Sequence, residues 1–106
     1  MLNIEKRIEN GSALYLLEGR LDTNSAAGLE KDLKETLTGL TELTLDLEKL
    51  DYISSAGLRL LLSARKTMDG RGPMKLVHVG EAVMTILETA GFLSYLNIEK
   101  LQDEDP

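Results

Sequence analysis

The sequence predicts a single α/β domain in which helices cover at least one face of a mixed β-sheet. Two kinds of segment alternate along the chain. In one kind, such as residues 42–47, apolar and polar residues alternate as in a strand, and in the other the apolar residues recur at helical spacing. The resulting order is β-β-α-β-α-β-α, followed by a short last element. Strands that alternate with helices favour parallel pairing, whereas the two opening strands favour an antiparallel pair.

The chain begins with a predicted β-hairpin. Residues 2–9 alternate weakly between apolar and polar side chains, and residues 13–18 are apolar enough to form a central strand. Between them, Asn10-Gly11 is a strong signal for a tight turn. The first two strands are therefore expected to pair in opposite directions.

A loop over residues 19–25 leads to the first predicted helix. This loop is rich in residues that cap helices, and Thr23 or Asn24 is expected to be the cap. Thr38-Gly39 ends the helix. Its apolar stripe consists of Ala26, Leu29, Leu33 and Leu37.

The strand at residues 42–47 leads to a tight turn and then to a second helix, which is expected from about Ala56 to Met68. In the last third of the chain, residues 74–79 predict a buried strand and residues 81–89 a helix. The last element, residues 95–101, is either a short strand or a helical turn. The domain is expected to span residues 1–102, and the acidic residues 103–106 to form a frayed tail.

Two adjacent hydroxyls, Ser54 and Ser55, lie where the turn becomes the second helix. The free N–H groups of a first helical turn point toward such oxygens, so the simplest role of a serine here is an N-cap. The same groups can hold a phosphate, which makes a modified serine the alternative. A nucleophilic serine would need a base and an oxyanion hole, but the sequence has no Gly-x-Ser-x-Gly turn. We therefore do not expect an enzyme.

One face of the second helix is a candidate surface for a protein partner. With about 100° of rotation per residue, Leu60 falls away from the predicted core stripe of Leu58, Leu61, Leu62 and Met68. A small, weakly polar face of this kind suits a protein better than a small ligand. It begins at Ser55 and continues through Ala56, Arg59, Leu60 and Ser63. The alternative is that Leu60 packs against a neighbouring helix.

Composition excludes several classes of protein. A net charge of −6 and only four aromatic residues argue against binding to nucleic acid or to an anionic membrane. No apolar run is long enough to cross a bilayer, and no signal peptide is visible. The absence of cysteine excludes disulfides and thiolate metal sites. Together these features favour a cytoplasmic protein.

No cofactor and no metal are expected. The only histidine, His78, lies in the apolar run of residues 74–79 and is interpreted as a core or edge residue. The reason is that no second ligand is nearby.

The serine turn resembles the phosphorylation site of bacterial anti-sigma factor antagonists, members of the STAS-domain family. Tyr-Ile-Ser-Ser-Ala-Gly-Leu at residues 52–58 is similar to the family pattern of an aromatic, an aliphatic, Asp, Ser, Ser or Thr, Gly and Leu. The family's phosphorylated serine falls on Ser55. Gly-Arg-Leu-Asp at residues 19–22 also resembles the family's Gly-Glu-Leu-Asp loop, whose aspartate falls on Asp22.

Two positions depart from the family pattern. The aspartate before the phosphorylated serine is Ser54 in this chain, and the second hydroxyl is replaced by Ala56. The substitution leaves Ser54 as an alternative phosphorylation site. It also removes a negative charge beside the acceptor, which should alter recognition by a kinase.

The resemblance implies a STAS-type fold and a partner-switching function. In such a switch, the unphosphorylated antagonist binds an anti-sigma factor that is also a serine kinase. Phosphorylation breaks that complex, and a serine phosphatase restores the antagonist. The implied partner-binding surface consists of Asp22, Asn24, Ser54, Ala56, Arg59, Leu60 and Ser63.

The sequence is also compatible with two other functions. One is a STAS module that senses a small ligand such as a nucleotide or a lipid. The other is a partner switch whose output is something other than a sigma factor. A serine hydrolase is disfavoured because the chain lacks a catalytic triad.

Overall fold

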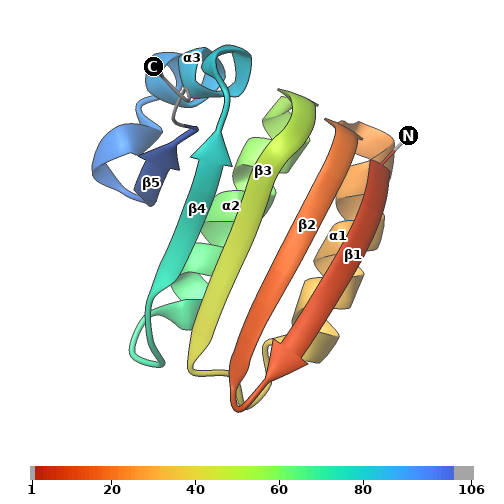
Figure 1. The fold of residues 1–106 in the computed structure, drawn as a ribbon, viewed down its shortest axis with the longest axis vertical. Coiled ribbons are helices and arrows are strands. Elements are labelled where there is room, and N and C mark those ends of the chain that lie inside the picture. Colours follow the sequence, from red (N-terminus) through yellow and green to blue (C-terminus); the bar gives the residue numbers. More distant parts are fainter. Residues whose placement is uncertain (1, 102–106) are drawn as a thin grey trace, which may run out of the picture.

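The computed structural model describes residues 2–101 and contains one five-stranded sheet (Figure 1). Along the chain the elements are β1 (Leu2–Glu9), β2 (Ser12–Leu21), α1 (Thr23–Thr36), β3 (Glu42–Ile53), α2 (Ser55–Met68), β4 (Met74–Val79), α3 (Glu81–Thr89), a 3-10 turn η1 (Phe92–Ser94) and β5 (Asn97–Lys100). The predicted α/β class and element order are confirmed. The predicted acidic tail, residues 103–106, lies outside the described residues.

The strands lie in the sheet in their sequence order, from β1 to β5. The hairpin strands β1 and β2 are antiparallel, and every following neighbour is parallel. Asn10 and Gly11 form the predicted tight turn, and both have positive φ angles, 48° and 85°. A two-residue hairpin turn needs this conformation to match the twist of its strands.

The central strands are longer than predicted. β2 continues to Leu21, although residues 19–21 were expected in a loop, and β3 continues to Ile53 instead of ending at residue 47. The pairing of these two strands shifts register near Gly19, whose φ angle is 109°. An irregularity of this kind interrupts the alternation of apolar and polar residues, which is why the pattern hid the ends of the strands.

A leucine-rich core fills the space between the sheet and the helices α1 and α2, which lie behind it in Figure 1. Each fully buried leucine contributes about 1.5–3 kcal/mol relative to an exposed one. The strands contribute Tyr15, Leu17, Leu21, Leu43, Leu45 and Leu47, and the two helices contribute Leu29, Leu33, Leu61 and Met68. No helix between residues 2 and 101 is both long enough and apolar enough to span a membrane.

The buried face of α2 differs from the predicted stripe. Leu58 and Leu62 are only half-buried, whereas Leu60 keeps 5% of its surface exposed. The prediction that Leu60 lies outside the core is therefore wrong. Because α2 packs against α1 as well as the sheet, Leu60 lies close to Leu33 of α1 and to Leu37, which follows the last residue of that helix. The alternative, packing against a neighbouring helix, is confirmed.

A hydrogen-bond network joins α1 to the opening hairpin. The buried Tyr15 hydroxyl donates to Asp32 Oδ1 at 2.6 Å, and the Lys6 ammonium donates to the same oxygen at 2.9 Å. Burial opposes ionisation of Asp32, but these hydrogen bonds outweigh it and lower the pKa of that carboxyl. Burial, reinforced by the bond to Asp32, raises the pKa of Tyr15. The network therefore combines an ionised carboxylate with a neutral phenol.

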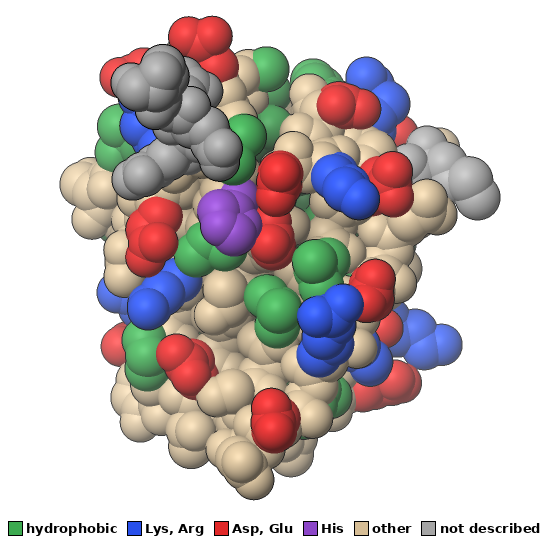
Figure 2. Space-filling model, in the orientation of Figure 1, with side chains coloured by type: hydrophobic (Ala, Val, Ile, Leu, Met, Phe, Trp, Pro, Cys, Tyr) green, Lys and Arg blue, Asp and Glu red, His purple; other side chains and the backbone are tan. Residues whose placement is uncertain are grey.

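The face of the sheet opposite α1 and α2 faces the viewer in Figures 1 and 2. Half-buried apolar side chains from the central strands, including Leu14, Leu16 and Val77, lie on it among charged groups. This open face carries few large apolar groups, and charged side chains surround them in Figure 2.

Candidate functional site

The strand register brings the starts of α1 and α2 to the same edge of the sheet. Leu21, the last residue of β2, pairs with Ile53, the last residue of β3. Asp22 and Ser54 follow these two residues, and the Ser54 amide donates to the Leu21 carbonyl at 2.8 Å. The Gly-Arg-Leu-Asp motif at residues 19–22 and the serine motif at residues 52–58 are distant in the sequence. The strand pairing therefore brings them together in one continuous structure.

Asp22 caps α1, so the prediction that Thr23 or Asn24 is the cap is wrong. The Ser25 amide donates to Asp22 Oδ1 at 3.0 Å, and the Asp22 amide donates to Ser25 Oγ at 2.9 Å. This reciprocal pair is a capping box, with serine in the place of the usual Glu or Gln. The bond from the Ser25 amide holds the pKa of Asp22 below its usual value. A fixed carboxylate thus lies at the start of α1, next to the serine turn.

The two serines have different surroundings. Ser54 is the N-cap of α2, and its hydroxyl oxygen accepts a hydrogen bond from the Gly57 amide at 3.2 Å. Ser55 is the first residue of the helix, and it is exposed. Ser54 therefore satisfies the backbone of the first turn, while Ser55 is accessible to another protein.

Gly57 fixes the position of this turn against the sheet. A Cβ atom at Gly57 would lie 2.9 Å from Leu21 Cγ, 2.9 Å from Ile53 Cγ2 and 3.0 Å from the Leu21 carbonyl oxygen. Atoms in cores do not approach this closely, so only glycine fits without movement. The glycine of the Ser-Ser-Ala-Gly-Leu motif is explained by packing.

A groove of about 390 Å³ lies between the first halves of α1 and α2. From α2, it is lined by Ala56, Arg59, Leu60 and Ser63, which are four of the residues predicted to bind a partner. Because Leu60 is buried, it forms the floor of the groove and is not a projecting contact. A second cavity of about 170 Å³ shares Glu30, Leu60 and Ser63 with it and continues along the helices.

The other predicted residues lie at the edge of this groove or beside it. Asp22 and Ser54 cap the two helices that form the groove, and Asn24 is exposed in the first turn of α1. Sequence reasoning missed the wall that α1 provides, which consists of Thr23, Ala26, Ala27 and Glu30. The pair of alanines directly after the capping box, Ala26-Ala27, was the available signal, since small residues leave space between packed helices.

Arg20 and Tyr52 form a further link between the two strands that lead to the site. The Arg20 guanidinium lies 4.3 Å from the centre of the Tyr52 ring, within the range of a cation–π contact. The Arg20 carbonyl also accepts a hydrogen bond from Ser25 Oγ at 2.8 Å. The aromatic residue of the serine motif is thus tied to the loop that carries Asp22.

Comparison with known proteins places this arrangement in a family. Residues 3–104 match the model of the STAS domain. A Bordetella bronchiseptica protein, BtrV, which is named as an anti-sigma factor antagonist, is 37% identical over 87 residues, or 80% of this chain and 75% of its own length.

Solved structures share the fold at low sequence identity. An anti-sigma factor antagonist from Mycobacterium paratuberculosis superimposes with a TM-score of 0.85 at 17% identity, and covers 93% of this chain and 86% of its own. The phosphorylated form of the Bacillus cell fate determinant SpoIIAA superimposes with a TM-score of 0.72 at 14% identity, over 96% and 93% of the two chains. The chain therefore belongs to the STAS domain family, and one relative, which is 37% identical over 80% of the chain, is named as an anti-sigma factor antagonist.

Proposed function

We propose that this domain is an anti-sigma factor antagonist that works by partner switching. In the unphosphorylated state it binds an anti-sigma factor through the groove between α1 and α2. Phosphorylation of Ser55 by the serine kinase activity of that factor releases the complex, and a serine phosphatase restores binding. The domain acts as a ligand and a substrate in this scheme, so its role is regulatory rather than catalytic.

The observation that carries this proposal is the exposure of Ser55 beside the groove while Ser54 serves as the cap. A kinase can reach the hydroxyl of Ser55 without opening the fold. The hydroxyl of Ser54, in contrast, is engaged by the Gly57 amide at 3.2 Å. Of the two candidate serines, Ser55 is therefore the better acceptor.

Electrostatics explain why a phosphate at Ser55 would change the surface more than the fold. The group adds a charge of about −1.5 to −2 at pH 7. At the first residue of a helix, the free N–H groups and the helix dipole favour an anion, so α2 would remain folded. The Asp22 carboxylate at the start of α1, whose pKa is lowered, already contributes a negative charge at this end of the sheet. The added charge would repel an acidic surface of the partner and occupy space at the mouth of the groove.

The relatives support the proposal in two ways. BtrV is named for the antagonist function, and SpoIIAA has been solved in both unphosphorylated and phosphorylated forms with this same fold. A STAS-type domain thus has precedent for carrying a phosphate.

Mass spectrometry of phosphopeptides from protein purified from its native cells tests the acceptor. We expect phosphate on Ser55 in the wild type and in Ser54→Ala, and none in Ser55→Ala. Phosphate on Ser54 alone would contradict the assignment. The switch is tested by binding of purified Ser55→Ala and Ser55→Asp to the anti-sigma factor encoded nearest to the gene. We expect Ser55→Ala to bind in the presence of ATP and Ser55→Asp to bind weakly or not at all.

A further inference from the structure

Three potential metal ligands meet on the open face of the sheet, away from the edge that carries Ser55. Asp46 and Glu48 belong to β3, and His78 belongs to β4. Their ligand atoms all lie within 4.8 Å of one another. In Figure 2 the single histidine, coloured purple, lies beside acidic side chains. The premise that no second ligand lies near His78 is therefore wrong. The side chain is exposed on a strand that has a neighbour on each side, so His78 is neither the core nor the edge residue that the sequence predicted.

An irregularity in β4 turns His78 toward this face. The strand alternates until Leu76, which is buried, so a regular continuation would direct His78 to the helix-covered side. The pairing with β5 shifts between Leu76 and Val79, and His78 has a φ angle of 54°. The extra residue lets Val79 enter the core and leaves His78 exposed on the opposite side. Bulges are known to redirect a side chain in this way.

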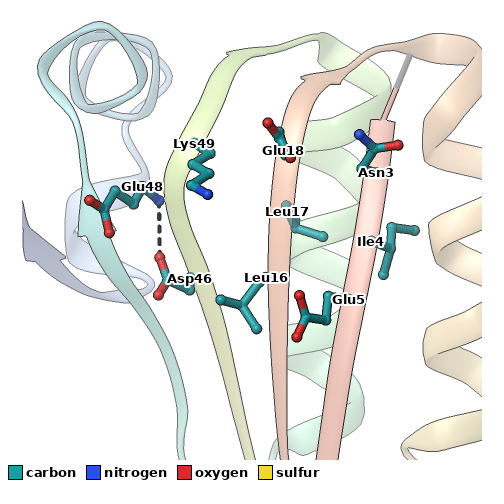
Figure 3. Close-up of a pocket in the computed structure, with 9 residues that line it drawn as sticks. All are labelled: Asn3, Ile4, Glu5, Leu16, Leu17, Glu18, Asp46, Glu48 and Lys49. Atoms are coloured by element: carbon teal, nitrogen blue, oxygen red, sulfur yellow. Dashed lines mark hydrogen bonds between the residues drawn. The ribbon is translucent and has the colours of Figure 1, made fainter.

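The parallel pairing of β3 and β4 supplies the two carboxylates. Asp46 pairs with Val77, the residue before His78, so its side chain lies beside the imidazole. Asp46 Oδ2 is 3.0 Å from His78 Nδ1. The other oxygen, Oδ1, accepts a hydrogen bond from the Glu48 amide at 3.0 Å, which is drawn as a dashed line in Figure 3. This bond orients the carboxylate and leaves Oδ2 for the cluster, as supporting bonds do in metal sites.

We propose that Asp46, Glu48 and His78 form a binding site for one divalent first-row transition metal ion of the Zn²⁺ type. Ligand atoms bind such an ion at about 2.0–2.2 Å from the metal, so two of them lie roughly 3–3.5 Å from each other. The distance between Asp46 Oδ2 and His78 Nδ1, 3.0 Å, is close to this range. Glu48 is exposed, so its side chain can rotate to complete the set. An imidazole with two carboxylates is a donor set for Zn²⁺, Co²⁺ or Mn²⁺, whereas Mg²⁺ and Ca²⁺ prefer oxygen alone.

The structure also leaves room for further ligands of the ion. A pocket of about 170 Å³ on the open face adjoins the cluster, and Asp46 and Glu48 form part of its wall. Leu16 and Lys49 line the same pocket. In Figure 3 the Glu48 carboxylate points from β3 toward β4, the strand that carries His78. With three ligands from the protein, the remaining positions of the ion would face water or a donor that enters this pocket.

Calorimetric titration of the full, untagged chain with ZnCl₂ tests the proposal. The chain has one histidine and no cysteine, so no other imidazole or thiolate competes for the metal. We expect the wild type to bind one ion per chain with micromolar affinity. Asp46→Asn and His78→Asn should each lower that affinity at least about tenfold. Asparagine is chosen for residue 78 because it tolerates a positive φ angle, so this variant is expected to stay folded. Circular dichroism checks the fold of each variant.

Glu9→Gln is the matched control, because it removes one negative charge from an exposed residue of β1 outside the cluster. We expect it to bind Zn²⁺ as the wild type does. Absorption of the Co²⁺ complex provides a second readout, since the intensity of its visible d–d bands reports the coordination geometry of the bound ion and should fall in His78→Asn. Millimolar binding by the wild type, several weak sites per chain, or equal binding by His78→Asn would overturn the proposal.

Discussion

The backbone amide of Gly57 donates a hydrogen bond to the hydroxyl oxygen of Ser54, 3.2 Å away, and this bond gives the two adjacent serines different roles. Ser54 stabilises the start of α2, whereas Ser55 is exposed in its first turn. The distinction could not be made from the Ser-Ser pair itself, because either serine is a suitable cap. It leads directly to the first prediction.

Ser54→Ala should destabilise the domain by about 0.5–2 kcal/mol, because it removes the side-chain cap of α2. Ser55→Ala should change the free energy of unfolding by less than about 0.5 kcal/mol, since it replaces an exposed side chain. Urea unfolding followed by circular dichroism measures both. Equal losses of unfolding free energy in the two variants would show that both serines contribute to the cap.

Leu60→Ala should lower the free energy of unfolding by about 2–5 kcal/mol, because it empties the contact between α1 and α2. Leu60→Glu should be at least as damaging, since it would bury a charge. Ser63→Ala, an exposed position in the same groove, is the control and should remain close to the wild type. If Leu60→Glu were stable but bound the partner more weakly, Leu60 would belong to the docking surface and not to the core.

Gly57→Ala should destabilise the domain by about 1–3 kcal/mol, because the new Cβ atom would press on Leu21 and Ile53. Gly28→Ala is the matched control within α1, where no atom beyond the adjacent residues and the backbone of the helix itself lies within 4 Å of the added Cβ. There the substitution should stabilise the protein by about 0.4–1 kcal/mol through the higher helix propensity of alanine. Melting temperatures that move in the same direction for both variants would contradict the packing argument.

The network of Asp32 predicts how stability depends on pH. The folded state lowers the pKa of Asp32, so its contribution is complete above the unfolded pKa of about 4. As the pH falls through the lower folded pKa, the unfolded state binds more protons and that contribution is lost. Asp22 acts in the same direction. Urea midpoints between about pH 6 and pH 2.5 should therefore decline less steeply for Asp32→Asn than for the wild type. Identical slopes would exclude Asp32 as a source of the acid sensitivity.

Periodicity predicted the class and order of the elements because the central strands and the helices each bury one side. It did not predict which side of α2 is buried. Leucines occupy positions 58, 60, 61 and 62, so several stripes have similar apolar content. The position of α1 decides among them, and this is a tertiary relationship. The pattern around Leu60 therefore admitted two interpretations, and only packing distinguished them.

The candidate sites differ in whether their residues come from one segment of the chain or from several. The serine turn is contiguous, so its motif was visible in the sequence, whereas the groove needs α1 as its second wall. The cluster of Asp46 and His78 joins residues 32 positions apart and depends on parallel pairing and a bulge. Neither condition has a signature in the local sequence. For this reason the proposed metal ligands could not be predicted from the sequence, whereas the Ser-Ser motif was visible in it.

The fit of Gly57 against Leu21 and Ile53 has a consequence for how an enzyme would meet Ser55. The acceptor is held on a rigid corner of the folded protein, with no extended segment that could enter a substrate cleft. Under the proposed function, a kinase must recognise the three-dimensional shape of this corner, and a short synthetic peptide spanning residues 50–60 should be a poor substitute for the intact domain.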